Sequence, residues 1–266
     1  MRDNTAIEIL FPEYGNQGGD NGNAMILRES LPEATFIETP YGATPYFADH
    51  EPSLIMMNSM PEMQQENAIK ALMPHKARLQ GLIDAGTPVL FTGIAGEVLA
   101  RSIANPDGST VEGLGILDAT GERREPQRFR DVNLGVFDPG DGSAPIELVG
   151  YKIQFTQVRG DNSRDYFCQN EIGFGLNDGT KLEGFRVKNL MVTWMLGPLL
   201  PLNPDFTAWL LRLSSSNVLA ARAYALERNN LLMQLSFSAF AAAQSAIDAA
   251  QKEIEGLAGK RGDLRF

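Results

Sequence analysis

Residues 88–97 have the residue types, in the right order, for a strand–turn–helix site that could expose a reactive side chain. The apolar run Val89–Phe91 predicts a strand, and the small residues from Gly93 to Gly96 predict a tight turn before a helix. In a nucleophile elbow, such a turn exposes its central side chain, and the amides of the helix N-terminus stabilise an oxyanion. A working elbow needs serine or cysteine, whereas this turn offers only the hydroxyl of Thr92. From these residues alone, an ordinary turn between a strand and a helix is favoured.

The chain has one cysteine and two histidines, which restricts the chemistry available to it. Cys168 lies in a predicted strand, and its neighbours in sequence supply no base or helix N-terminus that would lower its pKa. It is therefore predicted to be an inert structural cysteine. His50 and His75 lack the spacing of paired metal ligands, so they are predicted to be surface residues, and we expect no metal and no cofactor.

The loop after the first predicted strand, Gly15 to Asn23, is rich in glycine and asparagine. Loops of this kind can hold a phosphate with their backbone amides. This one has neither a Gly-Lys-Ser/Thr ending nor a clean G-x-G-x-x-G pattern, and the carboxylate of Asp20 would repel phosphate. Nucleotide binding at the loop is therefore disfavoured.

The composition is that of an ordinary globular protein, with 43% hydrophobic and 21% charged residues in 266. A net charge of −10 disfavours nonspecific binding to nucleic acid or to an anionic membrane. The N-terminus lacks the pattern of a secretory signal, and no apolar stretch reaches the length of a membrane helix. We therefore expect a cytoplasmic protein that binds neither nucleic acid nor membranes.

The elements that must position these residues alternate between strand and helix over the first 120 positions. Strands are predicted at 7–11, 35–38, 53–57 and 87–92, and helices from 23 and at 62–73, 76–85 and 97–103. Strands separated by helices of about 10 residues indicate parallel βαβ units. We therefore expect an α/β fold with a mostly parallel sheet flanked by helices.

The following segment, from Arg123 to Trp194, changes to a β-rich pattern. Strands at 132–137, 146–158, 166–174 and 185–188, with turns at 138–142 and 177–179, predict antiparallel additions at one side of the sheet. A strand at 190–194 and a helix at 205–213 would complete a domain of residues 1–214.

Residues 215–266 are predicted to form a C-terminal helical extension. From Phe240 to Leu257, apolar residues recur at alternating spacings of three and four, as in a short heptad pattern. Two interpretations stay open. The helix could dock on its own domain, which is the simpler one, or it could join two chains in a homodimer or bind a partner.

Several motifs resemble, in order, the class I glutamine amidotransferases of the cobyric acid synthase type, over roughly residues 6–213. The matching segments are 10–14, 19–23, 88–90, 113–118, 150–153, 173–179, 183–186 and 197–204. Gly19-Asp20-Asn21-Gly22-Asn23 is similar to the family's Gly-Asp-Arg-Gly-Asn loop, and residues 197–204 to its Gly-Pro-Leu-Leu-Pro-Lys-Asn-Pro run. The resemblance implies the fold of this family, which is flavodoxin-like, and, in its active members, glutamine hydrolysis.

The departures from the family pattern fall where its chemistry takes place. Gly93 occupies the position of the catalytic cysteine, and Leu196 that of the histidine before Gly-Pro-Leu-Leu-Pro. Gln154 fills a second histidine position. The resemblance places a degenerate pocket at Asn58, Ser59, Glu62, Thr92, Gly93, Ile94, Glu97, Gln154 and Leu196. Because loss of one catalytic group costs about 10⁴ to 10⁶ in rate, loss of two leaves no glutaminase mechanism.

These departures leave three hypotheses. The first is a non-catalytic amidotransferase-like protein that regulates or supports a Mur-ligase-like partner in cell-wall precursor modification. The second is an enzyme with relocated chemistry that uses Glu62, Glu97, Thr92 or Cys168 in the old cleft, for which a buried carboxylate could serve as general base. The third is an active glutamine amidotransferase that supplies ammonia to a ligase and relies on Cys168.

Overall fold

Four apolar segments of the sequence form the central strands of the main sheet. The structure, a computed structural model, describes residues 5–214. The sheet has the order β13-β14-β4-β3-β1-β2, with all neighbours parallel except β13 and β14. Its strands are β1 (Ala6–Leu10), β2 (Thr35–Thr39), β3 (Leu54–Met57), β4 (Val89–Thr92), β13 (Phe185–Val187) and β14 (Leu190–Thr193). The predicted α/β fold with a mostly parallel sheet is confirmed.

The strands β3, β4 and β14 are apolar at three or more consecutive positions because both faces of the sheet are buried. In β3, Leu54 and Met56 belong to one hydrophobic cluster, whereas Ile55 and Met57 belong to the other. Since successive side chains of a strand point to opposite faces, each strand contributes to two cores.

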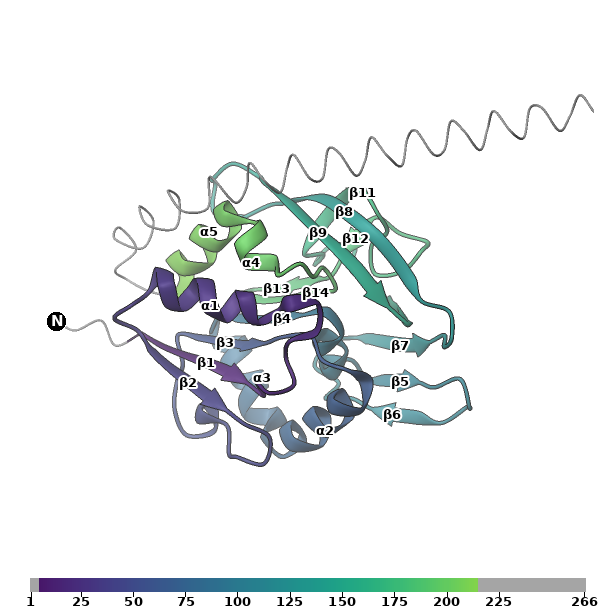
Figure 1. The fold of residues 1–266 in the computed structure, drawn as a ribbon, viewed down its shortest axis with the longest axis horizontal. Helices are drawn as coiled ribbons and strands as arrows, with labels where there is room; N and C mark the ends of the chain where they lie inside the picture. Colours follow the sequence, from purple (N-terminus) through teal and green to yellow (C-terminus); the bar gives the residue numbers. More distant parts are fainter. Residues whose placement is uncertain (1–4, 215–266) are drawn as a thin grey trace, which may run out of the picture.

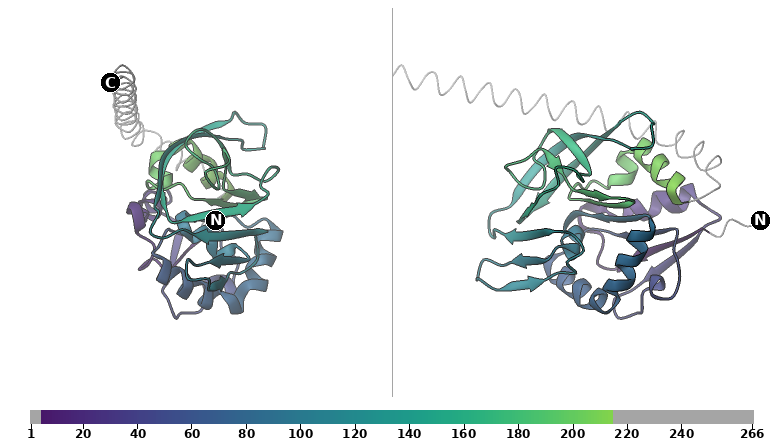
Figure 2. Two further views of the ribbon diagram at one scale, coloured as in Figure 1. Left: turned by 90° about the vertical axis from the view of Figure 1, so that its right-hand side faces the viewer. Right: turned by 180° about the vertical axis from the view of Figure 1, so that it is seen from behind.

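Helices cover both faces of the main sheet (Figure 1). The helices α2 and α3 pack in one hydrophobic cluster, and α1, α4 and α5 pack in the other. Figure 2 shows the same layers from the side and from behind. The helices are α1 (Asn21–Ser30), α2 (Glu62–Leu72), α3 (Lys76–Ala85), α4 (Leu199–Leu202) and α5 (Pro204–Ser214), with 3-10 turns η1 (Gln17–Gly19), η2 (Tyr46–Ala48), η3 (Met73–His75) and η4 (Gly93–Leu99).

Two smaller four-stranded sheets extend the domain, in the orders β10-β7-β5-β6 and β12-β11-β8-β9. Only β13 joins the main sheet in antiparallel fashion, so most of the antiparallel strands form sheets of their own rather than an addition to it. Their strands are β5 (Ser102–Ala104), β6 (Thr110–Glu112), β7 (Ala119–Arg123), β8 (Phe129–Phe137), β9 (Ile146–Gln154), β10 (Thr156–Gly160), β11 (Cys168–Ile172) and β12 (Leu182–Glu183).

Two sequence-based predictions of secondary structure are wrong. The expected helix at 97–103 is absent, because the 3-10 turn η4 ends at Leu99 and Ala100 is extended, with ψ of 166°. The chain then enters β5. The expected single strand at 146–158 is divided into β9 and β10, which lie in different sheets. In both places, contacts with distant segments override the local pattern.

The apolar stripe from Phe240 to Leu257 lies outside the described residues. The predicted C-terminal extension at 215–266, its boundary with the domain of residues 1–214 and the predicted homodimer therefore stay predictions. Within residues 5–214, no helix has the length and apolarity needed to cross a bilayer.

Candidate functional site

The carboxyl ends of β1, β3, β4 and β14 meet at one edge of the main sheet, because these four strands are parallel. In open α/β sheets, ligands bind at this edge. The loop after β1 brings Asp20, β3 leads into Asn58 and Ser59, and β4 ends at Thr92 and Gly93. Leu196 follows β14. The sequence-predicted pocket residues, Glu62 apart, are buried in this part of the molecule.

Gly93 lies between the ends of these strands in a conformation that favours glycine. Its φ of 56° is in the left-handed region, as expected for a sharp turn from a strand into a helix. An ideal Cβ added at Gly93 would lie 2.2 Å from Ser59 Oγ and 2.7 Å from Leu196 Cδ2. Both distances are far below van der Waals contact. The space in front of the turn is therefore filled by Ser59 and Leu196.

A group of polar side chains, the strand-end cluster, ties the surrounding loops together; it consists of Asp20, Asn23, Asn58, Ser59 and Thr92. The Asp20 carboxylate accepts hydrogen bonds from Thr92 Oγ1 at 2.5 Å and from Ser59 N at 3.1 Å. Asn23 Nδ2 donates to Asn58 Oδ1 at 3.3 Å. Asn23 Oδ1 accepts from the amide of Leu200 at 2.8 Å, which joins the first turn of α1 to α4.

Burial raises the pKa of Asp20 to about 6, although the hydrogen bonds from Thr92 and Ser59 act in the opposite direction. One carboxylate oxygen, Oδ1, and the Nδ2 group of Asn58 are buried without a hydrogen-bond partner among residues 5–214. Glycine at position 22 permits the close approach of α1 to Pro198, since a Cβ there would lie 2.4 Å from Pro198 Cγ. The cluster thus orders the loop after β1 and leaves two polar atoms unsatisfied.

A second buried group, the Glu97 cluster, lies behind Gly93 and consists of Gln65, Glu97, Arg123, Thr156 and Trp194. The Glu97 carboxylate accepts hydrogen bonds from Gln65 Nε2 at 3.0 Å, Thr156 Oγ1 at 3.2 Å and Trp194 Nε1 at 3.2 Å. Arg123 donates to Gln65 Oε1 at 2.6 Å. Burial raises the pKa of Glu97 to about 7, and the hydrogen bonds and the charge of Arg123 oppose this shift only in part.

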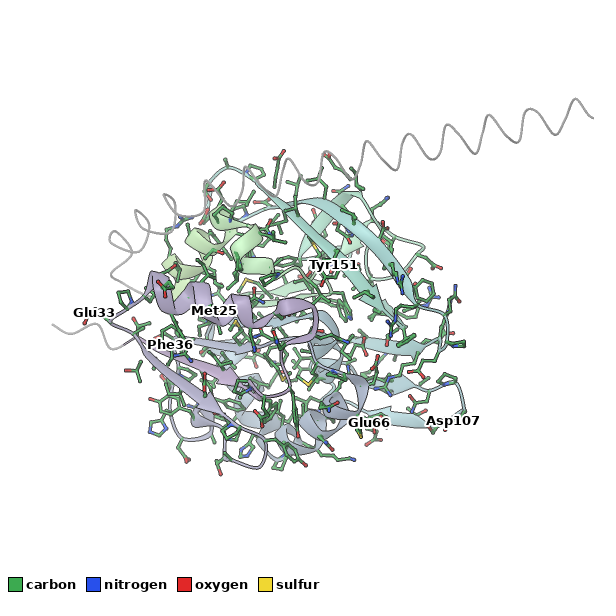
Figure 3. The ribbon with its side chains drawn as sticks, viewed as in Figure 1. Met25, Glu33, Phe36, Glu66, Asp107 and Tyr151 are labelled. Atoms are coloured by element: carbon green, nitrogen blue, oxygen red, sulfur yellow. The ribbon has the colours of Figure 1, made fainter. Side chains whose placement is uncertain are left out.

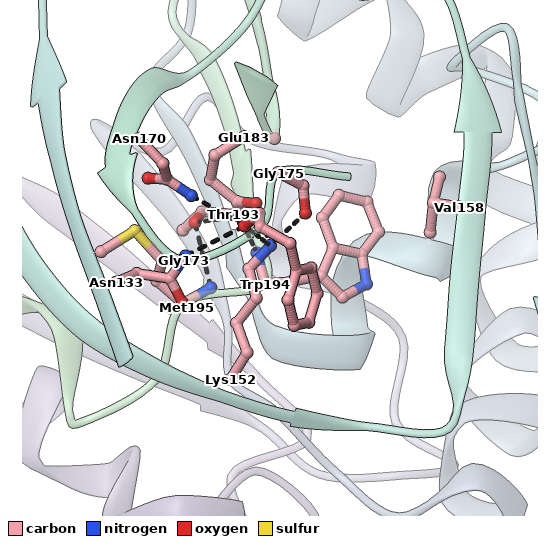
Figure 4. A network of polar contacts seen from close by, with 12 residues as sticks. Asn133, Lys152, Val158, Asn170, Gly173, Gly175, Glu183, Thr193, Trp194 and Met195 are labelled. Carbon is pink, nitrogen blue, oxygen red and sulfur yellow. Dashed lines mark hydrogen bonds and ion pairs between the residues drawn. The ribbon is translucent and has the colours of Figure 1, made fainter. Parts of the chain in front are cut away.

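A third buried group, shown in Figure 4, contains the ion pair of Lys152 and Glu183. Both side chains are completely inaccessible to solvent. The Lys152 ammonium also donates to the carbonyls of Phe174, at 3.2 Å, and of Gly175. Glu183 Oε1 accepts from Trp194 N at 2.7 Å. Trp194 therefore contacts both this pair and the Glu97 cluster.

Several sequence-predicted candidates lie apart from these groups. Glu62 is half-buried at the start of α2, and no contact with Glu97 is recorded among the described residues. Cys168 is buried in β11 next to Asn170 and Met195, and burial raises its pKa further from the thiolate range. His50 is exposed and stacks on Tyr46.

Two other sequence candidates, Gln154 and Ile94, are linked to members of the Glu97 cluster by hydrogen bonds to backbone carbonyls. Gln154 Nε2 donates to the carbonyl of Thr156 at 2.6 Å, and the carbonyl of Ile94 accepts from Gln65 Nε2, also at 2.6 Å. Within residues 5–214, no group of three or more His, Cys, Asp or Glu side chains is arranged to hold a metal ion.

Sequence reasoning did not identify Asp20, Gln65, Arg123 or Trp194 as members of the site. From the sequence, Asp20 is a residue that would repel phosphate and a member of the Gly19–Asn23 motif, with no role in the pocket. One signal in the sequence concerns the third group, since Lys152 and Glu183 both lie in segments that resemble the family's motifs. A buried lysine requires a carboxylate partner, but the sequence does not indicate that Lys152 is buried.

Comparison with known proteins gives one curated relative and several solved structures. The chain is 30% identical over 152 residues to the lipid II isoglutaminyl synthase (glutamine-hydrolyzing) subunit GatD of Staphylococcus aureus (strain N315). The match covers 56% of this chain and 58% of that relative, so the chain spans little more than half of the relative's length. No protein-family model matches the chain.

Two solved structures of glutamine amidotransferases are similar in their backbone. One is 14% identical with a TM-score of 0.47, covering 78% of this chain and 98% of its own. The other, from Thermotoga maritima, is 10% identical with a TM-score of 0.49, covering 87% of this chain and 94% of its own. At TM-scores below 0.5, these likenesses carry no conclusion about the site.

Proposed function

We propose that this chain is a glutamine amidotransferase-like protein without glutaminase activity, which acts as a non-catalytic partner of a Mur-ligase-like enzyme in cell-wall precursor modification. The similarity to the staphylococcal subunit supports the amidotransferase-like part of the proposal and the connection with lipid II. The observation that carries the loss of activity is the filled space at Gly93. A nucleophile at this position would collide with Ser59 and Leu196.

Glutamine hydrolysis by this family requires a sulfur that forms an acyl-enzyme and a base that activates it. Glycine supplies no nucleophile at position 93, and the leucine at 196 accepts no proton. The one cysteine of the chain, Cys168, is buried in β11 with a raised pKa, so it does not provide a replacement thiolate.

The direct test is the release of ammonia from glutamine labelled with ¹⁵N in its amide group. We expect the purified chain to release no labelled ammonia above the rate in buffer alone. The staphylococcal lipid II isoglutaminyl synthase (glutamine-hydrolyzing) is the active reference. Turnover that disappears in Cys168→Ala would refute the proposal and establish the third hypothesis, an active amidotransferase that supplies ammonia to a ligase.

The partnership is tested separately by purifying the chain from its native cells under mild conditions. We expect a Mur-ligase-like protein to co-purify in stoichiometric amount. Recovery of the chain alone, from lysates in which it is present well above micromolar concentration, would contradict the role as a ligase partner. This result would leave the proposed absence of glutaminase activity unaffected.

A second candidate function, relocated acid–base chemistry, has one observation in its favour. The pKa of Glu97, about 7, suits a general acid or base at neutral pH. However, both of its carboxylate oxygens accept hydrogen bonds inside the protein, and no contact with Glu62 is recorded among residues 5–214. We therefore favour a structural role for Glu97.

A further inference from the structure

An open groove lies between helix α2 and strand β6. It has a volume of about 670 Å³. Its helix wall includes Ile69, Lys70 and Met73, and its strand wall is Thr110, Val111 and Glu112. Its surface is mainly apolar, with Met73 38% exposed and Val111 half-buried against the core.

The strand wall is the free edge of a sheet. β6 is the last strand in the order β10-β7-β5-β6, and it pairs only with β5, in antiparallel fashion. Asn105 N donates to Ser109 O at 2.8 Å, and Gly113 N donates to Arg101 O at 3.0 Å, on either side of β6. In an antiparallel ladder, residues alternate between bonded and non-bonded pairs.

By this alternation, the backbone of Val111 faces β5, whereas the N–H and C=O groups of Thr110 and Glu112 face away from it. Among the described residues, no hydrogen bond is recorded for these outward groups. Two N–H donors and two C=O acceptors thus border the groove. This arrangement can accept one further strand, as in recognition by β-strand addition.

The charges at the walls indicate which strand fits. Glu112 is exposed on the strand wall, with no ion pair recorded among residues 5–214. On the helix wall, Glu66 is paired with Arg123 at 3.1 Å, and the exposed Lys70 is the one cation among the described residues of the lining. Opposite charges on directly paired strands are stabilising, so a basic residue is favoured beside Glu112. The adaptable side chain of Met73 and the apolar Ile69 favour an aliphatic side chain in the groove.

We propose that this groove binds an extended segment of a partner protein, in which aliphatic and basic residues alternate, by adding it as a strand to β6. This surface is separate from the strand-end cluster and does not depend on the proposed function.

The test is the binding of a fluorescein-labelled heptapeptide of alternating valine and lysine to the full chain, measured by fluorescence anisotropy. A second peptide carries N-methyl groups on the residues whose N–H would face β6. It keeps the charge and side chains but cannot donate to the strand. We expect the unmethylated peptide to bind with saturation and the methylated peptide to bind at least tenfold more weakly.

Two variants of the chain separate strand addition from simple charge attraction. Thr110→Pro removes an N–H that has no partner in the fold, and proline is tolerated on edge strands, so this variant should fold and bind at least tenfold more weakly. Glu112→Gln should weaken binding more than Glu33→Gln, a matched loss of one carboxylate. Glu33 lies on the opposite side of the molecule from Glu66 (Figure 3).

Equal binding of the two peptides, unchanged binding by a folded Thr110→Pro variant, or no saturation at millimolar peptide would each overturn the proposal. A concentration-dependent dimer that Thr110→Pro abolishes would also overturn it, because the occupant would then be a second copy of this chain. Protection of the Thr110 and Glu112 amides from hydrogen exchange on peptide binding would support it.

Discussion

Replacing Glu97 by glutamine should remove a large part of the pH dependence of stability. The pKa of Glu97 is raised from 4.5 to about 7 in the folded protein because its carboxyl group is buried. Between these two values, the folded state holds a proton that the unfolded state releases. Stability from this group is therefore complete below pH 4.5 and is lost as the pH rises through 7.

The magnitude follows from the difference between the two pKa values. A shift of one unit corresponds to 1.36 kcal/mol, so this shift amounts to about 3 kcal/mol over the full range. Asp20 is shifted in the same direction, to about 6, so the wild-type protein should be distinctly more stable at pH 5 than at pH 8. Glu97→Gln removes only the part that belongs to Glu97.

The assay is urea unfolding at pH 5 and pH 8 at constant ionic strength, for the wild type and two variants. Because part of the shift lies below pH 5, we expect the difference in unfolding free energy between the two pH values to shrink by about 2–3 kcal/mol in Glu97→Gln. Glu62→Gln, which removes a half-buried carboxylate with no recorded contact to the Glu97 cluster, should keep the wild-type difference. The same pH dependence in the wild type and in Glu97→Gln would refute this account of the buried carboxyl group.

Three further predictions concern stability and reactivity. Gly93→Ala should destabilise the protein by about 2–4 kcal/mol in urea unfolding, from left-handed strain and overpacking against Ser59, and the added substitution Ser59→Gly should restore part of the loss. Lys152→Met should lower the free energy of unfolding by about 3–5 kcal/mol because it leaves Glu183 buried without a counter-charge. The double variant Lys152→Met with Glu183→Leu should lose less stability than the sum of the two single variants, and strict additivity would contradict the coupling. Cys168 should resist alkylation by iodoacetamide in the native protein and react only after unfolding, and rapid native labelling, followed by mass spectrometry, would contradict its burial.

The sequence predicts the main sheet well because β3, β4 and β14 are apolar at consecutive positions. The predicted helix at 76–85 matches α3, which is followed by Gly86 in a left-handed conformation, with φ of 90°. The strands β5 and β6 are not predicted from the sequence, because three residues are too few to show a periodic pattern. Their positions depend on pairing with distant segments.

The candidate site was predictable in part. The resemblance located Gly93, Ser59 and Leu196, which the fold brings into contact. It did not indicate the partners of Glu97, because Gln65 and Trp194 are 32 and 97 positions away in the sequence. The predicted helix at 97–103 fails for the same reason. The Glu97 carboxyl group turns inward to these partners instead of lying on the surface of a helix.

The hydrogen bond from the amide of Leu200 to Asn23 bears on when the protein can fold during its synthesis. It joins positions 177 residues apart, and β14 enters the sheet beside β4 after an intervening stretch of nearly a hundred residues. On the ribosome, the early βαβ units emerge long before the strand and the short helix that complete their carboxyl edge. Nascent chains halted before Leu200 should therefore stay sensitive to protease at the loop after β1, since contacts of such sequence separation form late. In longer nascent chains, this loop and the segment around Leu200 should become resistant to protease at the same chain length.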